Sequence, residues 1–170
     1  VLWLIVVNID NPTGTNYYTL NDVELINKEY VESSDTIGKM CMPEQNQDSI
    51  KVAITATKKI RDKIKVTDIS AVADLQQAVS LDTNPVMVPI TVTCSVPGVS
   101  PSDIKVTPQN LSVNLDEKET QEFVVNVSRG DTKPGKDYEV GSLTASPEKV
   151  RITGPKTLIN KIDKVNASIE

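Results

Sequence analysis

The feature that most constrains the fold of this chain is an internal repeat. The segment "IKVAITATKKIRDKI" ends at Ile64, and "KVRITGPKTLINKI" ends at Ile162, 98 residues later. At that separation the following positions coincide: Val52 with Val150, Ile54 with Ile152, Thr55 with Thr153, Lys58 with Lys156 and Lys63 with Lys161. Spacing shared over this length indicates a duplication, which predicts successive similar units along the chain.

Most of each copy alternates between apolar and polar residues, as strands with one buried face do. Ile50, Val52 and Ile54 share one face of the predicted strand 49–55. Similar strands are predicted at 18–27, 86–96, 104–115, 123–128 and 149–153. Strands about ten residues apart, with Pro, Gly and Asn between them, predict a mainly β fold. Pro89 predicts an edge position or a bulge for its strand.

Two segments depart from this alternation and predict short helices. Ile60 and Ile64 are four residues apart in the first copy, as are Leu158 and Ile162 in the second. Pro155 suits the first turn of the second helix. Return strands follow at 68–75 and 163–170.

A fainter echo links "PQNLSVNL", from Pro108, to "PEKVRITG", from Pro147. Both have the pattern Pro-x-x-apolar-x-apolar. The echo predicts that one unit consists of two crossed halves, each entering a strand through a proline-bearing turn.

The apolar start "VLWLIVV" allows two interpretations, a buried first strand or the end of a membrane helix, since a span needs about 20 such residues. The turn-forming segment "NIDNPTGTN" that follows favours a tether leaving a membrane. Leu2, Trp3, Leu4 and Ile5 are then the candidate membrane-proximal contact residues.

The second copy is shorter than the first. The sequence runs on for only three residues after Ala167, whereas the first copy continues well beyond its counterpart Ala71. We therefore expect a truncated second module with unpaired strand edges and a half-open core, as a fragment of a longer chain.

Composition argues against several chemistries. The chain has 170 residues and no histidine, which removes Ser-His-Asp and Cys-His catalysis within it. With 18 basic and 23 acidic side chains it lacks the basic surface that nucleic acid requires. Cys41 and Cys94 fit no zinc pattern, so they either form one disulfide or act as ordinary small apolar residues. No metal, no cofactor and no catalytic residue is predicted.

Three charged runs are candidate sites. "KKIRDKIK", 58–65, is interpreted as the solvated face of a short helix. "DEKE", 116–119, is the place where a paired-carboxylate hydrolase could be built, but a solvated turn or linker is the simpler interpretation. "DTKPGKD", 131–137, lacks the ligand spacing of a calcium loop and is predicted to be a turn.

In their order, these segments resemble the YbbR domain family. "KVRITGPKTLINKIDKVNASIE" is similar to the first half of that domain, as is "IKVAITATKKIRDKIKVTDISAVADL" with Asp74 and Leu75. "VTCSVPGVSPSDIKVTPQNLSVNLDEKETQEF" resembles its second half, and "LWLIVVNIDNP" the end of its N-terminal membrane helix. The first copy departs from the pattern, with "ATKK" in place of "GPKT" and a long polar loop at 33–49.

The resemblance implies an organisation. Residues 1–15 would be the end of a membrane helix and its tether, 16–117 a first YbbR domain, and 118–170 the first part of a second, truncated one. The protein would be a single-pass membrane protein, with its β domains on the extracytoplasmic face of a Gram-positive bacterium.

The resemblance also implies a role without catalysis: binding and regulating the membrane diadenylate cyclase that makes cyclic di-AMP, with phosphoglucosamine mutase as a further partner of the complex. The alternative is a structural or adhesive spacer on the cell surface, built from β repeats.

Overall fold

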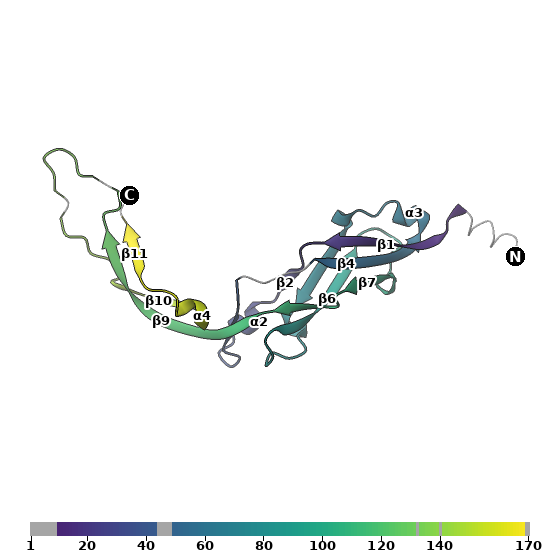
Figure 1. The fold of residues 1–170 in the computed structure, drawn as a ribbon, viewed down its shortest axis with the longest axis horizontal. Helices are drawn as coiled ribbons and strands as arrows, with labels where there is room; N and C mark the ends of the chain where they lie inside the picture. The colour runs from purple at the N-terminus through teal and green to yellow at the C-terminus, as the bar shows by residue number, and fades with distance from the viewer. Residues whose placement is uncertain (1–9, 44–48, 132, 140, 169–170) are drawn as a thin grey trace.

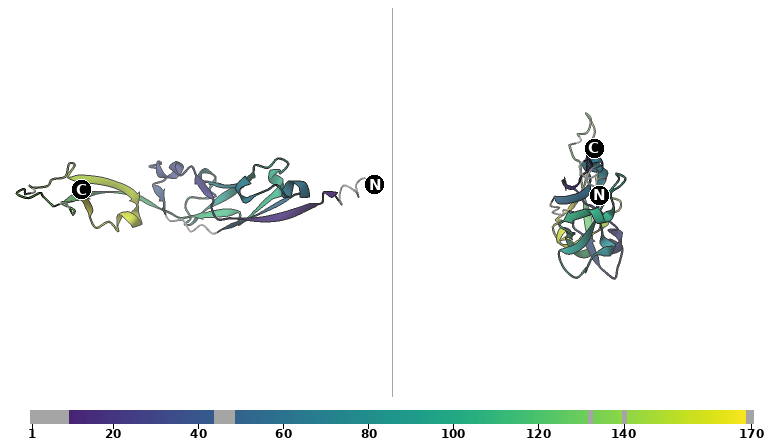
Figure 2. Two further views of the ribbon diagram at one scale, coloured as in Figure 1. Left: turned by 90° about the horizontal axis from the view of Figure 1, so that it is seen from above. Right: turned by 90° about the vertical axis from the view of Figure 1, so that its right-hand side faces the viewer.

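The computed structural model describes residues 10–43, 49–131, 133–139 and 141–168. The molecule is elongated, with two groups of strands placed end to end (Figures 1 and 2). We call the described residues up to Asn114 the first unit, and those from Lys118 onward the second unit. The long strand β9 (Leu115–Ser128) runs out of the first unit and through the second.

Strands are the predominant regular structure of the described residues, which confirms the mainly β prediction. The other strands are β1 (Thr13–Leu20), β2 (Glu24–Ile26), β3 (Lys39–Cys41), β4 (Ile50–Thr57), β5 (Ile69–Asp74), β6 (Val86–Cys94), β7 (Ile104–Thr107), β8 (Asn110–Val113), β10 (Lys149–Pro155) and β11 (Val165–Ser168). The short α-helices are α2 (Glu29–Glu32), α3 (Lys58–Arg61) and α4 (Lys156–Ile159). The 3₁₀ turns are η1 (Val66–Asp68), η2 (Leu75–Gln77) and η3 (Pro101–Asp103).

The first unit consists of two sheets that exchange strands. One sheet has the order β1-β4-β7 and the other β2-β5-β6-β8. The chain segment from β4 to β5 therefore contributes one strand to each sheet, as does the segment from β6 to β7. The predicted crossing of two halves is present. In the structure, β4 is the counterpart of β6, and β5 is the counterpart of β7. The predicted counterparts, the strands that follow Pro108 and Pro147, are not related in this way.

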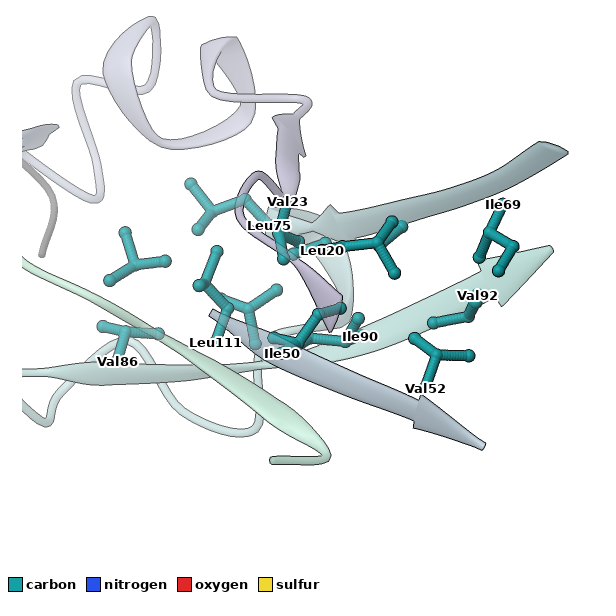
Figure 3. Packing of buried hydrophobic residues seen from close by; sticks show 14 of the residues in the cluster. Leu20, Val23, Ile50, Val52, Ile69, Leu75, Val86, Ile90, Val92 and Leu111 are labelled. Carbon is teal, nitrogen blue, oxygen red and sulfur yellow. The ribbon is translucent and has the colours of Figure 1, made fainter. Parts of the chain in front are cut away.

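The core of the first unit is formed by the inward faces of these strands (Figure 3). Val52, Ile54 and Val88 are fully buried, as their alternating positions predict. No buried residue among those described is polar or charged, so this core contains no titratable group. Its stability comes from apolar burial, at about 25 cal/mol per Å² of surface removed from water.

The segment 8–16 was predicted to be an irregular tether, but its second half is part of a strand. Thr13 to Asn16 lie in β1, where Thr13 pairs with Thr57 of β4. Turn-forming residues are accommodated in this strand because the β4 ladder supplies the backbone partners. Gly14 leaves room for Arg61, because a Cβ at position 14 would lie 3.0 Å from the guanidinium and the Arg61 side chain would have to shift.

Pro89 lies neither on an edge strand nor at a bulge. The first part of β6 pairs with β8 up to Pro89, and the rest pairs with β5 from Ile90 onward. Pro89 stands where the strand changes partner, so its missing N–H removes no bond from the β5 ladder. Pro155 is likewise displaced from its predicted place, as the N-cap of α4 and not a residue of its first turn.

Two predicted loops contain strand. The run 116–119 belongs to β9, in the stretch that passes from the first unit to the second, so it is a strand and not the predicted turn. The long loop after Ser33 includes β3, which pairs with the start of β9: Cys41 lies opposite Leu115. The sequence did not reveal this strand, because three residues are too few to show an alternation of apolar and polar side chains. Such a strand is recognised only from its pairing with another strand.

Candidate interaction surface

The two copies of the repeat adopt the same local structure. The bounds of β4 and α3 coincide with those of β10 and α4 at the separation of 98, apart from the first residue of β4. Asp62 N–H donates to Lys58 O at 3.0 Å, and Asn160 N–H to Lys156 O at 3.0 Å. On the sheet face, Thr55 Oγ1 lies 2.8 Å from Thr15 Oγ1, and the equivalent Thr153 Oγ1 lies 2.7 Å from Thr120 Oγ1.

The start of each short helix is held by a side chain from outside the helix. Asn11 Oδ1 accepts from the Lys59 backbone N–H at 2.9 Å. Asp116 Oδ2 accepts from the Thr157 backbone N–H at 2.7 Å, at the equivalent place in the second unit. Each oxygen satisfies one of the N–H groups that a helix start leaves without an internal partner. This is the structural role of the acidic run in β9.

The second unit exposes the face that the first unit buries. Val52 and Ile54 are 0% exposed, whereas their counterparts Val150 and Ile152 are only half-buried. Ile64 is 8% exposed, and its counterpart Ile162 is also half-buried. The second unit therefore presents a partly uncovered apolar face, which we call the open face and define by Val150, Ile152, Ile162, Val165 and Ala167.

The strands of the second unit also have unpaired edges. In the first unit β4 lies between β1 and β7, and β5 lies between β2 and β6. In the second unit β10 and β11 each pair with β9, and no other described strand pairs with either of them. A cavity of about 350 Å³ lies at this end, lined by side chains that include Val127, Leu143 and Ala167. Free edges beside an apolar face are the usual setting for strand addition.

The junction between the units is held on both edges of β9. Lys118 N–H donates to Gly38 O at 2.8 Å, on the edge that pairs with β3. Leu115 N–H donates to Asn84 Oδ1 at 3.3 Å, from the segment that leads into β6. The Lys118 ammonium also lies 3.5 Å from the carboxylate of Asp35, which is almost fully exposed and contributes little. The long loop thus connects the first unit to the strand that enters the second.

Two charged groups around α4, Asp116 and Lys156, have shifted pKa values. The Thr157 N–H lowers the pKa of Asp116, because this hydrogen bond favours the charged carboxylate. Glu117 lies 2.6 Å from the Lys156 ammonium, and this contact raises the pKa of Lys156. The contacts of Asp116 with Thr157 and of Glu117 with Lys156 hold α4 against β9. Because these carboxylates are largely exposed and bonded to α4, they do not resemble the carboxylate pair of a hydrolase active site.

Both cysteines are free and half-buried. Cys41 lies in β3 and Cys94 at the end of β6, so the disulfide alternative is not realised. Burial, followed by the Glu32 carboxylate, raises the pKa of Cys41 to about 11. A thiol with so high a pKa is a poor nucleophile and a poor metal ligand at neutral pH.

The candidate membrane-proximal residues Leu2, Trp3, Leu4 and Ile5 lie outside the described residues. The described helices include none with the length and apolar content that crossing a membrane requires. Among the residues with described positions, no group of His, Cys, Asp or Glu could hold a metal ion. The structure also offers a feature that the sequence did not reveal, the junction formed where β3 pairs with β9. The unpaired edges of the second unit were expected from the sequence, and the structure assigns them to β10 and β11.

The second unit carries the clearest similarity to known proteins. Residues 124–169 match the family model of YbbR-like protein. That range holds β10, α4 and β11, so the YbbR resemblance is confirmed for this part of the chain.

Among solved structures, a YbbR-like protein from Streptococcus pneumoniae TIGR4 is similar at 16% identity and a TM-score of 0.44. That match covers 93% of this chain and 75% of the other. No curated protein matches the chain.

Proposed function

We propose that the chain is a tandem pair of YbbR-like modules, divided near residue 117, that acts by binding and not by catalysis. The YbbR family match over 124–169 supports this for the second unit. The observation that extends it to the first unit is the shared strand, helix and hydrogen-bond geometry at the separation of 98 residues. The first unit adds the strands that complete such a module.

The partner proposed for these modules is the membrane diadenylate cyclase, whose synthesis of cyclic di-AMP the protein regulates. A membrane helix ending near residue 15 would place the modules on the extracytoplasmic face and raise their effective concentration beside the cyclase. Leu2, Trp3, Leu4 and Ile5 would pack against the cyclase's own helices, where close van der Waals contact drives association. Phosphoglucosamine mutase is a further proposed member of the complex.

The test uses the full-length protein in its native membrane. Affinity capture should retain the cyclase, and deletion of the protein should change cyclic di-AMP levels. Complementation with a version whose membrane helix is replaced by an unrelated helix separates the two contributions. Loss of capture only in the exchanged version assigns recognition to the membrane helix that would include residues 2–5, whereas retained capture assigns it to the β units. Absence of the cyclase, together with unchanged cyclic di-AMP, would contradict the proposal.

A structural spacer is the second candidate function. It is favoured by the elongated arrangement and by the continuous strand β9, which is bonded on both edges at the junction (Figure 2). Such a junction resists bending, as a stalk requires. In a spacer, deletion would leave cyclic di-AMP unchanged, and shortening the chain by one unit would be as harmful as deleting it.

A further inference from the structure

The two copies of the short helix share a backbone but differ in charge. Residues 58–65 hold five basic side chains and one acidic one, whereas their counterparts 156–163 hold two basic side chains and one acidic one. The bounds of α3 and α4 nevertheless coincide at the separation of 98. The additional basic side chains of the first copy are therefore not required for the strand and helix to form.

One of these basic side chains has a structural role. The Arg61 guanidinium is half-buried and donates to Ala56 O at 3.1 Å and to Asn16 Oδ1 at 3.0 Å. The others are exposed lysines, which we call the basic tip: Lys58, Lys59, Lys63 and Lys65. None of their ammonium groups forms an ion pair with another described residue. The four lysines are therefore available to a partner.

The second unit offsets the charge of its helix at a place where the first unit does not. By the register of the two ladders, Asn11 is the counterpart of Asp116, and Pro12 is the counterpart of Glu117. The Glu117 carboxylate lies 2.6 Å from the Lys156 ammonium in the second unit. Because both acidic residues have neutral counterparts beside α3, the positive charge of α3 is not compensated there.

The acidic groups around the basic tip do not balance it. Asp10 and Asp62 are exposed. Asp68 and Asp103, in the turns η1 and η3, are half-buried, and each carboxylate accepts a backbone N–H bond within its own turn. Exposed ammonium groups thus outnumber exposed carboxylates at this end of the first unit, although the whole chain has a formal charge of -5.

The helix α3 lies at the end of the elongated molecule where the chain enters β1 (Figure 1). The Lys58 N–H donates to Pro12 O at 3.0 Å, and the Lys59 N–H donates to Asn11 Oδ1 at 2.9 Å. The helix is therefore fastened to the residues that lead into the first strand. A membrane attachment that precedes these residues, as proposed above, brings α3 to the lipid surface.

We propose that the basic tip binds the anionic headgroups of the lipid bilayer to which the chain is attached. The inference rests on the membrane attachment in the proposed function, but not on the cyclase. Lysine is a compact point charge on a flexible stem, so it suits mobile headgroups and needs no built pocket. Each lysine close to an anionic surface strengthens binding about fivefold. With α3 on the headgroups, the second unit at the opposite end of the molecule is held away from the membrane (Figure 2).

The experiment measures cosedimentation of the whole 170-residue chain with lipid vesicles. One set of vesicles is phosphatidylcholine, and the other is equimolar phosphatidylcholine and phosphatidylglycerol. The chain should bind the anionic vesicles more tightly, and this preference should vanish at about 1 M salt, where the Debye length is about 3 Å. Replacing all four lysines of the basic tip by glutamine should weaken binding to the anionic vesicles about tenfold or more. Binding to phosphatidylcholine alone, to which the apolar residues 1–7 contribute, should not change.

A matched control replaces four exposed lysines of the second unit by glutamine, which changes the net charge by the same amount. These lysines are Lys133, Lys136, Lys161 and Lys164. The control should keep the affinity of the unmodified chain for anionic vesicles. Equal losses in both variants would overturn the proposal, because net charge and not the basic tip would then be responsible.

Three other results would also overturn it. They are the absence of a preference for anionic vesicles, full binding by the basic-tip variant, and stronger competition by inorganic phosphate than by sodium chloride of equal ionic strength. The last result would show a site for a single anion and not for a lipid surface. The vesicles contain no cyclase, so failed cyclase capture would leave lipid binding unaffected. Failed lipid binding would likewise leave cyclase capture from native membranes unaffected.

Discussion

Asp116 accepts a hydrogen bond from the backbone N–H of Thr157, with 2.7 Å between carboxylate oxygen and nitrogen. Asn11 makes the equivalent bond to Lys59 in the first unit, at 2.9 Å. The helix start is thus secured in the same way twice, once by a neutral and once by a titratable side chain. This difference gives the second unit a pH response that the first unit lacks at this place.

Replacing Asp116 should expose that response. The hydrogen bond lowers the pKa of Asp116 in the folded protein, so its contribution to stability is present above the unfolded value of about 3.9. It is lost as pH falls through the lower folded pKa. Asp116→Ala should lower the free energy of unfolding of the second unit by about 1 kcal/mol at pH 7. Thermal unfolding followed from pH 2 to pH 7 measures this.

Two exchange variants serve as controls. Asp116→Asn keeps an acceptor and should make the second unit less sensitive to acid. Asn11→Asp should introduce acid sensitivity in the first unit. If Asp116→Asn destabilises the second unit at pH 7 as much as Asp116→Ala does, the carboxylate's charge and not its acceptor oxygen stabilises the helix.

The open face predicts unequal costs for equivalent substitutions. Val52→Ala removes two buried methyl groups from a closed core and should cost about 2 kcal/mol, including the cavity left behind. Val150→Ala, at the same place in the second unit, should cost about 1 kcal/mol or less because Val150 is half-buried. Urea unfolding at a concentration where the chain is monomeric makes the comparison. Equal costs would mean that the open face is covered in solution.

The sequence was sufficient for features that depend on local pattern. Alternation located β4, β6 and β10, and the spacing of Ile60 and Ile64 located α3, because burial of one face selects these periods directly. The repeat at 98 residues predicted that two helices would begin at equivalent positions, and they do. These features are encoded within about fifteen residues and need no knowledge of distant partners.

Features that depend on distant partners were missed. Thr13 to Asn16 have the composition of a turn, and only the β4 ladder makes them a strand. The acidic residues of β9 have low strand propensity, yet β3 and β10 hold them extended. Sequence also predicted a half-open core, but not how the two sheets of the first unit exchange strands. That exchange depends on the pairings of β4 with β7 and of β5 with β6, whose residues lie far apart in the chain.

Cys41 should react slowly with alkylating agents. A pKa of about 11 in place of 9.0 leaves about a hundredfold less thiolate at pH 8. In a Cys94→Ser background, the alkylation rate of Cys41 by iodoacetamide should therefore keep rising up to about pH 11. Glu32→Gln should shift this profile to lower pH, because the Glu32 carboxylate is the second cause of the raised pKa after burial. A midpoint near 9 in the unsubstituted Glu32 background would show that Cys41 is exposed in solution.

The β3 pairing should determine how firmly the two units are joined. Met40 lies opposite Asp116. Two residues away on either side, the Lys118 N–H donates to Gly38 O and the Met42 N–H donates to Asn114 O. Because the bonding direction repeats every two residues in an antiparallel pair, the Met40 N–H also points toward β9. Met40→Pro removes that donor and should detach β3 from the strand. Hydrogen exchange at the Lys118 amide, which donates to Gly38 O at 2.8 Å, should then accelerate about fivefold or more, since a bond of this kind contributes about 1 kcal/mol or more. Met40→Ala keeps the N–H and should leave this exchange rate unchanged. Equal acceleration in both variants would show that the Met40 side chain, and not the ladder, holds the junction.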